Sequence, residues 1–226
     1  MCGICGIHHF KNSQPVEEPV IRRMTESIRH RGPDDEGYYF GESIGFGFRR
    51  LSIIDLVSGH QPMSDAAGKI WVVFNGEIYN FPELRRELAQ QGCEFRTNSD
   101  TEVIIHGYRK WGMDVLDHLS GMFGLAIWDV KDRRLMLARD RMGIKPIYYY
   151  LSQDTLVFGS EIRAVLAGGA VYAGMDICSA ALFLQFRYVP SPRTIFRDIN
   201  KLASGTRLVV EKGVARCEQW WNFAPR

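Results

Sequence analysis

Residues 121–140, GMFGLAIWDVKDRRLMLARD, predict two β-strands joined by a short turn. Apolar and aromatic residues dominate 122–129 and 133–140, and the intervening VKD has the polar character of a tight connection. The next two apolar runs, 147–151 and 155–159, are separated by SQD in the same way. Because strands on short connections pair antiparallel, this region favours a β-rich core over alternating βαβ units.

Outward from this region, the chain predicts more strands and a few helices. Strand-like composition recurs upstream at 1–10, 38–40, 44–48, 51–54 and 70–74. Helical periodicity is found at 16–30, 81–92 and 101–112, and a short helix closes at 165–170. Pro82 in the first turn and Gly92 at the end are typical helix boundary signals. The sequence therefore predicts an α+β layered sandwich.

The composition excludes several classes of protein. The 226 residues are 46% hydrophobic and 24% charged, as in an ordinary globular protein. With a net charge of +2 and interspersed acids and bases, neither nucleic acid nor an anionic membrane is an expected partner. The sequence shows neither the apolar run of a transmembrane helix nor the pattern of a signal peptide, so the expected location is the cytoplasm.

The five cysteines include a CxxC pair at Cys2 and Cys5. An odd number at irregular spacing argues against a disulfide framework. On a strand, Cys2 and Cys5 would face opposite sides and could not share a metal ion. No second ligand pair or helical redox context accompanies them, so no metal site is expected. Cys5 is interpreted as a small buried hydrophobic residue.

The chemistry open to Cys2 differs from that of Cys5, because Cys2 directly follows the initiator methionine. A small second residue normally permits methionine removal, which would leave a cysteine bearing both its thiol and a free α-amine. An amine with a pKa of about 7.7 to 8.0 next to a thiol can act as its proton acceptor, so no catalytic histidine is required. Spacing alone does not prove this role.

The chain changes character near residue 170. Beyond it come a helix-like run at 176–186, the loop-rich RYVPSPRTIF, and the segments LASGTRLVV and QWWNFAPR. We predict a first domain over residues 2–170 and a connecting segment over 171–226, which packs on the first domain or leads into another one.

A set of motifs identifies a resemblance. MCGICGI, RHRGPDDEG, RRLSIIDL, GHQPM, VFNGEIYNF, TNSDTEV, GMFGLAIWD, ARDRMGIKPIYY and FGSEIRAVL occur in this order. Their order and spacing resemble the glutaminase domain of class II glutamine amidotransferases and, within that class, the glutamine-hydrolysing asparagine synthetases. The resemblance covers residues 2 to about 167 and is highly specific. It implies the four-layer αββα sandwich of N-terminal nucleophile hydrolases.

The resemblance also implies site residues. Cys2 matches the nucleophile, with its freed α-amine as general base and acid, and Asn75 and Gly76 match an oxyanion hole. Read without the family, NG after a strand is most often a hairpin turn; the VFNGEIYN context and the helix that soon follows favour a strand-to-helix connection instead. Arg50, rather than Arg49, matches the residue that binds the α-carboxylate of L-glutamine.

The remaining matches complete the implied glutamine site. Asp100 and Glu77 match acceptors for the α-ammonium of glutamine. A single charged side chain is usually just solvated at the surface. A guanidinium opposite carboxylates, however, can bind both the α-carboxylate and the α-ammonium of a free amino acid. Structural roles near a synthetase partner are expected for the other matching residues, Arg139, Asp140, Lys145 and Pro146. No role is assigned to any histidine, and no cofactor or metal is expected for this domain.

In the family, ammonia passes to a C-terminal domain that uses ATP and Mg²⁺ to amidate aspartate. The SGGxDS motif of that synthetase domain is absent from the chain, so the sequence is interpreted as a fragment, or as a stand-alone member with a separate partner; a homodimer is possible. KLASG replaces the family's KLPPG. Two alternatives therefore stay open: amidation of another acceptor, such as a sugar or cell-surface polymer precursor, and an inactive interaction module with the same fold.

Overall fold

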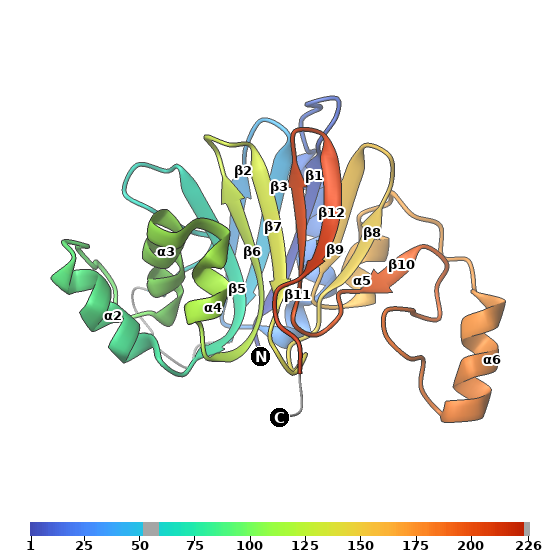
Figure 1. Ribbon diagram of the computed structural model, residues 1–226. Helices are drawn as coiled ribbons and strands as arrows, with labels where there is room; N and C mark the ends of the chain where they lie inside the picture. The colour runs from blue at the N-terminus through green and yellow to red at the C-terminus, as the bar shows by residue number, and fades with distance from the viewer. Residues whose placement is uncertain (52–58, 224–226) are drawn as a thin grey trace.

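Two six-stranded antiparallel sheets form the centre of the computed structural model, which describes residues 1–51 and 59–223 (Figure 1). The first sheet has the order β10-β8-β9-β1-β3-β2. Its strands are β1 (Gly3–His9), β2 (Asp35–Phe40), β3 (Ile44–Arg50), β8 (Tyr148–Leu151), β9 (Thr155–Gly159) and β10 (Ile199–Lys201).

The second sheet has the order β12-β11-β7-β6-β5-β4. Its strands are β4 (Met63–Ser64), β5 (Ile70–Ile78), β6 (Gly121–Asp129), β7 (Arg134–Arg139), β11 (Thr206–Glu211) and β12 (Val214–Gln219). The two strands predicted from residues 121–140 are β6 and β7, which pair antiparallel as expected.

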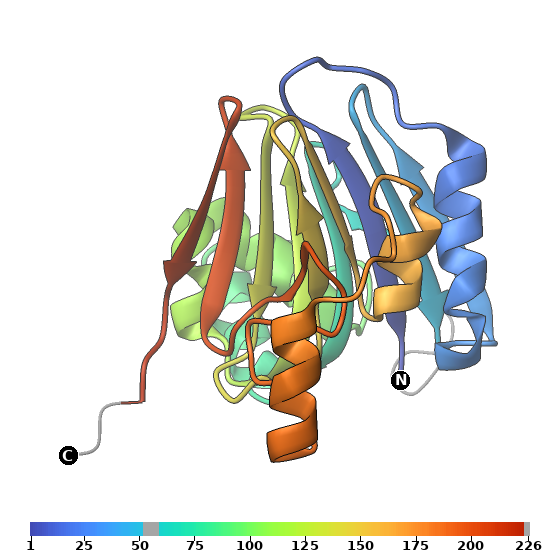
Figure 2. The same cartoon turned by 90° about the vertical axis from the view of Figure 1, so that its right-hand side faces the viewer.

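Helices cover the outer face of each sheet, which gives four layers (Figures 1 and 2). Helices α1 (Glu18–Ser27) and α5 (Ile162–Ala167) pack on the first sheet and on each other, and α3 (Asp100–Trp111) packs on β5 of the second. The other helices are α2 (Phe81–Gln90), α4 (Val115–His118) and α6 (Ile177–Phe186), with 3₁₀ turns at Arg29–Arg31 and Gly112–Asp114. The predicted α+β sandwich is confirmed.

Three apolar cores correspond to the three interfaces between these layers. The strand alternation on β5 shows how the sequence builds them. Val73 faces the core between the two sheets, whereas Val72 and Phe74 face the core under α3. A third core lies between the first sheet and α1 and α5, and it contains Cys5.

The structure corrects the expected end of β5 and the expected role of Asn75 and Gly76 in the backbone. Strand β5 does not end at residue 74: it runs to Ile78, and Asn75 and Gly76 pair with Gly124 and Phe123 of β6. The NG pair is therefore neither a hairpin nor a strand-to-helix connection, because long-range pairing overrides its local turn preference. Most of the strand predicted at 51–54 lies outside the described residues.

The segment after residue 170 contributes to both sheets. Strand β10 pairs with β8, and β11 pairs with β7 and carries β12 at the sheet edge. These strands agree with the expectation that the segment packs on the first domain. The division of the chain at residue 170 stays a prediction.

Helix α6 stands apart from the sandwich (Figure 1). Its sequence, ICSAALFLQF, is apolar on all sides, yet only Ser179 is buried. Ile177 and Leu184 are 74% and 77% exposed. A helix that is apolar all round is normally enclosed, so this exposure needs an explanation.

No helix in the described ranges is both long and apolar enough to cross a membrane.

Candidate active site

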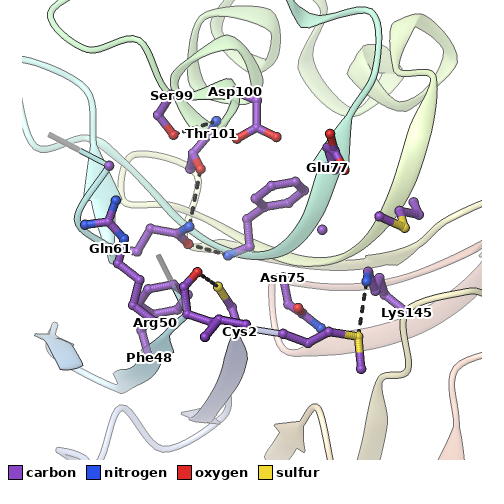
Figure 3. A pocket seen from close by; sticks show the side chains of 16 residues that line it. Cys2, Phe48, Arg50, Gln61, Asn75, Glu77, Ser99, Asp100, Thr101 and Lys145 are labelled. Carbon is purple, nitrogen blue, oxygen red and sulfur yellow. Dashed lines mark hydrogen bonds between the residues drawn. The ribbon is translucent and has the colours of Figure 1, made fainter. Parts of the chain in front are cut away.

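A pocket opens at one end of the sandwich, between the edges of the two sheets and the start of α3 (Figure 3). All six residues predicted for the glutamine site line it: Cys2, Arg50, Asn75, Gly76, Glu77 and Asp100. Three of them are consecutive on β5, and Cys2 directly precedes β1. The structure thus brings together residues up to 98 positions apart in the chain.

Cys2 and Cys5 lie on opposite faces of the first sheet, as predicted. The half-buried Cys2 packs at the edge of the core between the sheets, and its thiol donates to the Leu51 carbonyl at 3.6 Å. Cys5 is fully buried against α1, beside the Thr25 hydroxyl at 3.4 Å. Burial raises the pKa of the Cys5 thiol to about 12. Cys5 is therefore an inert packing residue, and Cys2 is the cysteine that a substrate can reach.

The backbone of Cys2 is held by Arg31. The Arg31 Nε donates to the Cys2 carbonyl at 3.0 Å, and the same guanidinium pairs with Glu161 at 3.1 Å. Residue Met1 still precedes Cys2 in the described chain, and its side chain also lines the pocket. Burial, supported by the charges of Arg31 and Lys145, lowers the pKa of the Met1 α-amine. The Met1 amine is therefore biased toward its neutral form.

Asn75 brings an unused donor into the pocket. Its side chain is buried, and its Nδ2 has no hydrogen-bond partner among the described residues. In Figure 3 the amide lies beside Cys2. Since buried donors are nearly always paired, an orphaned amide in the same pocket as a thiol suggests a partner that arrives with a ligand.

Gly76 supplies a second donor through its backbone. On β5 the odd-numbered residues bond toward β6, as the Tyr79 N–H to Ser120 carbonyl contact of 2.7 Å shows. The N–H of Gly76 therefore points to the other edge of β5, where no described residue accepts it. A Cβ at Gly76 would lie 2.2 Å from the Met122 carbonyl oxygen. Only glycine fits this backbone.

The two adjacent arginines have separate environments. Arg49 packs against α1, pairs with Glu26, and pairs with Glu36 at 2.8 Å, so it is a structural residue. Arg50 is also buried, but it lines the pocket on the opposite side of β3. The choice of Arg50 over Arg49 as the residue in the site agrees with this arrangement.

Two carboxylates lie across the pocket from Arg50 (Figure 3). Asp100, at the start of α3, is 5% exposed and accepts the Ile78 N–H at 3.0 Å. Burial raises the pKa of Asp100, and the nearby Glu77 carboxylate adds to this shift. Neither acid forms an ion pair with a described cation. A buried and a half-buried acid without a described counterion provide a site for an incoming positive charge.

Among the pocket residues that sequence reasoning did not place in the site are Gln61 and Lys145. Gln61 belongs to the GHQPM motif but received no role, and Lys145 was expected to be structural only. Their place in the matching motifs was the available signal. The neighbours of Lys145 are structural as predicted: buried Asp140 accepts four backbone N–H groups, and Arg139 donates to three carbonyls.

Among the described ranges, no cluster of three or more His, Cys, Asp or Glu side chains is arranged to hold a metal ion. None of the six histidines lines the pocket. The expectation that this domain works without a cofactor stays a prediction.

The four layers, with a pocket that brings together the Cys2 thiol, two backbone or amide donors and oppositely charged groups, define the class by fold as that of the N-terminal nucleophile hydrolases. The chain belongs to the glutamine amidotransferase domain family, whose pattern matches residues 1–221.

The family assignment is supported by individual relatives. The chain is 40% identical over 217 residues to asparagine synthetase [glutamine-hydrolyzing] 1 of Bacillus subtilis. This alignment covers 93% of this chain and 33% of that protein. It is 36% identical to asparagine synthetase [glutamine-hydrolyzing] 3 of the same organism, in an alignment that covers 98% of this chain and 37% of that protein. The chain thus spans about a third of the length of these relatives.

A solved structure agrees in fold. Glutamine phosphoribosylpyrophosphate amidotransferase from B. subtilis superposes with a TM-score of 0.71 over 97% of this chain and 49% of its own, at 20% sequence identity. The predicted N-terminal nucleophile hydrolase type of αββα sandwich is confirmed.

Proposed function

We propose that this domain hydrolyses L-glutamine to L-glutamate and ammonia through a thioester on Cys2, after removal of Met1. The observation that carries the proposal is that one pocket brings together Cys2, the Asn75 amide and the Gly76 N–H, and that neither donor has a partner among the described residues. A thiol and two hydrogen-bond donors in one pocket are the parts required for acyl transfer.

The bonds change in two steps. In the first, the Cys2 thiol transfers its proton to the α-amine of Cys2, and the sulfur attacks the side-chain carbonyl of glutamine. The resulting oxyanion accepts hydrogen bonds from Asn75 and Gly76. The amine returns the proton to the leaving nitrogen, and the C–N bond breaks to release ammonia. In the second step, water attacks the γ-glutamyl thioester, yields glutamate and restores the thiol.

Recognition of glutamine follows from the charges around the pocket. The Arg50 guanidinium would bind the α-carboxylate, and Asp100 and Glu77 would bind the α-ammonium. A guanidinium fork and a carboxylate pair distinguish a free amino acid from a peptide or a simple amide, because each charge left unpaired in the pocket is costly.

The test is a glutaminase assay that measures glutamate and ammonia from purified protein with a verified N-terminus. Cys2→Ala should abolish hydrolysis. Cys178→Ala, a change at an exposed cysteine on α6, should leave the rate unchanged. Unchanged hydrolysis by Cys2→Ala would overturn the thioester mechanism, and an inactive parent protein with a free Cys2 would favour an interaction module.

We further propose that the ammonia serves an ATP- and Mg²⁺-dependent synthetase part that amidates aspartate to asparagine. Two B. subtilis relatives, each named an asparagine synthetase, align along nearly all of this chain and extend far beyond it. The synthetase part would belong to a longer chain or to a separate partner.

The exposed helix α6 supports such a partner. Its apolar side chains continue into exposed Tyr172, Met175 and Tyr188 on the flanking segments. Exposed apolar patches of this kind mark interaction surfaces. We assign this surface to the synthetase part rather than to a second copy, because about two thirds of the length of these relatives lies outside the part that matches this chain.

Amide hydrogen exchange of α6 distinguishes a synthetase part from a second copy of the domain as the partner of this surface. The α6 amides should exchange more slowly in a chain that includes the synthetase part than in the 226-residue domain. Leu184→Lys should cancel that protection, and Lys131→Ala, on the exposed β6–β7 turn, should not. Dimerisation of the 226-residue domain that is lost in Leu184→Lys would assign the surface to a second copy instead.

A further inference from the structure

The open edge of β5 holds the strand that carries Asn75, Gly76 and Glu77. On this side β5 is paired only with the two residues of β4, opposite Trp71 and Val72. Beyond that point no described strand adjoins it. Since alternate residues point their N–H groups to the same edge, three donors lie along this margin: those of Phe74, Gly76 and Ile78.

Side chains replace the missing strand at two of these donors. Gln61 Oε1 accepts the Phe74 N–H at 2.6 Å, and Asp100 Oδ2 accepts the Ile78 N–H at 3.0 Å. The Gly76 N–H between them has no acceptor among the described residues. Two flanking donors are thus fixed, while the middle one is left free to bind.

Gln61 also connects this edge to α3. Its Nε2 donates to the Thr101 hydroxyl at 3.3 Å, next to Asp100. Gln61 and Thr101 are both buried, so water has little access to these bonds. One amide therefore fixes the distance between the oxyanion donor on β5 and the carboxylate on α3.

We propose that Gln61 is a positioning residue for glutamine hydrolysis, which holds the Gly76 N–H in line with the developing oxyanion. The inference rests on the proposed function and adds a residue to it. Without the Gln61 acceptor, the Phe74 N–H must find another partner, and the unsupported edge of β5 moves or twists to reach it. A displacement of about 1 Å at an oxyanion donor is enough to slow catalysis strongly.

The test is Gln61→Met, which keeps the length of the side chain and removes both hydrogen-bonding groups. We expect kcat for glutamine hydrolysis to fall about 10- to 100-fold, less than the loss expected for direct removal of an oxyanion donor. Gln90→Met, the same change at an exposed position of α2, should have no effect.

A second readout separates positioning from general damage. Iodoacetamide alkylates a thiol by displacement at carbon and forms no oxyanion, so the rate at Cys2, followed by mass spectrometry of its peptide, should be the same in Gln61→Met and the parent. A parallel loss of alkylation and hydrolysis would overturn the proposal, as would an unchanged kcat. Failure of the proposed function would appear differently, as a parent protein that does not hydrolyse glutamine at all.

Discussion

The Lys145 ammonium lies 3.2 Å from the thioether sulfur of Met1 inside the pocket. Lys145 is only 7% exposed, and no carboxylate of the described chain forms an ion pair with it. A thioether is a weak acceptor for a buried ammonium. Met1 precedes Cys2 in the chain and lines the pocket against Lys145, so its loss would open the pocket beside Cys2.

Removal of Met1 should therefore switch the enzyme on. With Met1 in place, the nitrogen of Cys2 is a peptide amide, which cannot accept the thiol proton. We expect protein cleaved to begin at Cys2 to hydrolyse glutamine, and protein that retains Met1 behind an N-terminal extension to have less than about 1% of that rate, consistent with loss of general-base catalysis. Intact-mass spectrometry identifies each form. Equal specific activities would contradict a role for the α-amine.

Replacement of Asn75 should lower activity without lowering the stability of the fold. Because its Nδ2 is buried without a partner among the described residues, removal of this donor breaks no hydrogen bond that the structure describes. We expect Asn75→Ala to lower kcat about 10²- to 10³-fold, while the melting temperature stays the same or rises. Assays of kcat and thermal unfolding on the same preparation check this pair of outcomes. A large drop in melting temperature would show that Asn75 is part of the structural framework instead.

Parts of this fold and site could be predicted from the sequence because they depend on local pattern. The β6–β7 pair follows from two runs rich in apolar residues around a polar turn, and Cys2 and Cys5 separate because strand faces alternate. Asn75–Gly76 was harder, since pairing with β6 outweighs a local turn preference.

Other features depend on contacts that no local pattern encodes. Gln61 meets Phe74 only because β4 ends early and leaves an edge to cover. Because strand faces alternate, Arg49 and Arg50 must face opposite sides of β3. The side that holds the pocket depends on α1, which packs on Arg49. The choice of Arg50 over Arg49 therefore came from the resemblance to a family and not from strand geometry.

Asp100 should make stability depend on pH in an unusual direction. Burial raises its pKa in the folded state, so the folded protein binds this proton more tightly than the unfolded chain. The contribution to stability is present below the unfolded-state pKa, about 3.8, and is lost as pH rises through the folded-state pKa. Asp100→Asn keeps an acceptor for Ile78 and removes the ionisation. Its free energy of unfolding should exceed that of the parent at pH 7.

Urea unfolding at pH 7 and at about pH 3.5 tests this sign, because the difference between Asp100→Asn and the parent should shrink at the lower pH. The same variant should raise KM for glutamine about 10- to 100-fold, as expected for loss of a charged hydrogen bond. Asp117→Asn, at an exposed position of α4, is the matched control and should change neither quantity. A destabilised Asp100→Asn at pH 7 would contradict the argument from burial.

The neighbouring arginines provide a matched pair of variants that differ by one position. Arg50→Lys removes the planar fork from the pocket, so KM for glutamine should rise about 10- to 100-fold with a smaller change in kcat. Arg49→Lys alters a contact with α1 and two partly exposed acids; it should lower the free energy of unfolding by about 1 kcal/mol or less and leave KM unchanged. Steady-state kinetics and urea unfolding on both variants separate these effects. If Arg49→Lys raised KM and Arg50→Lys did not, the assignment of the carboxylate-binding residue would be reversed.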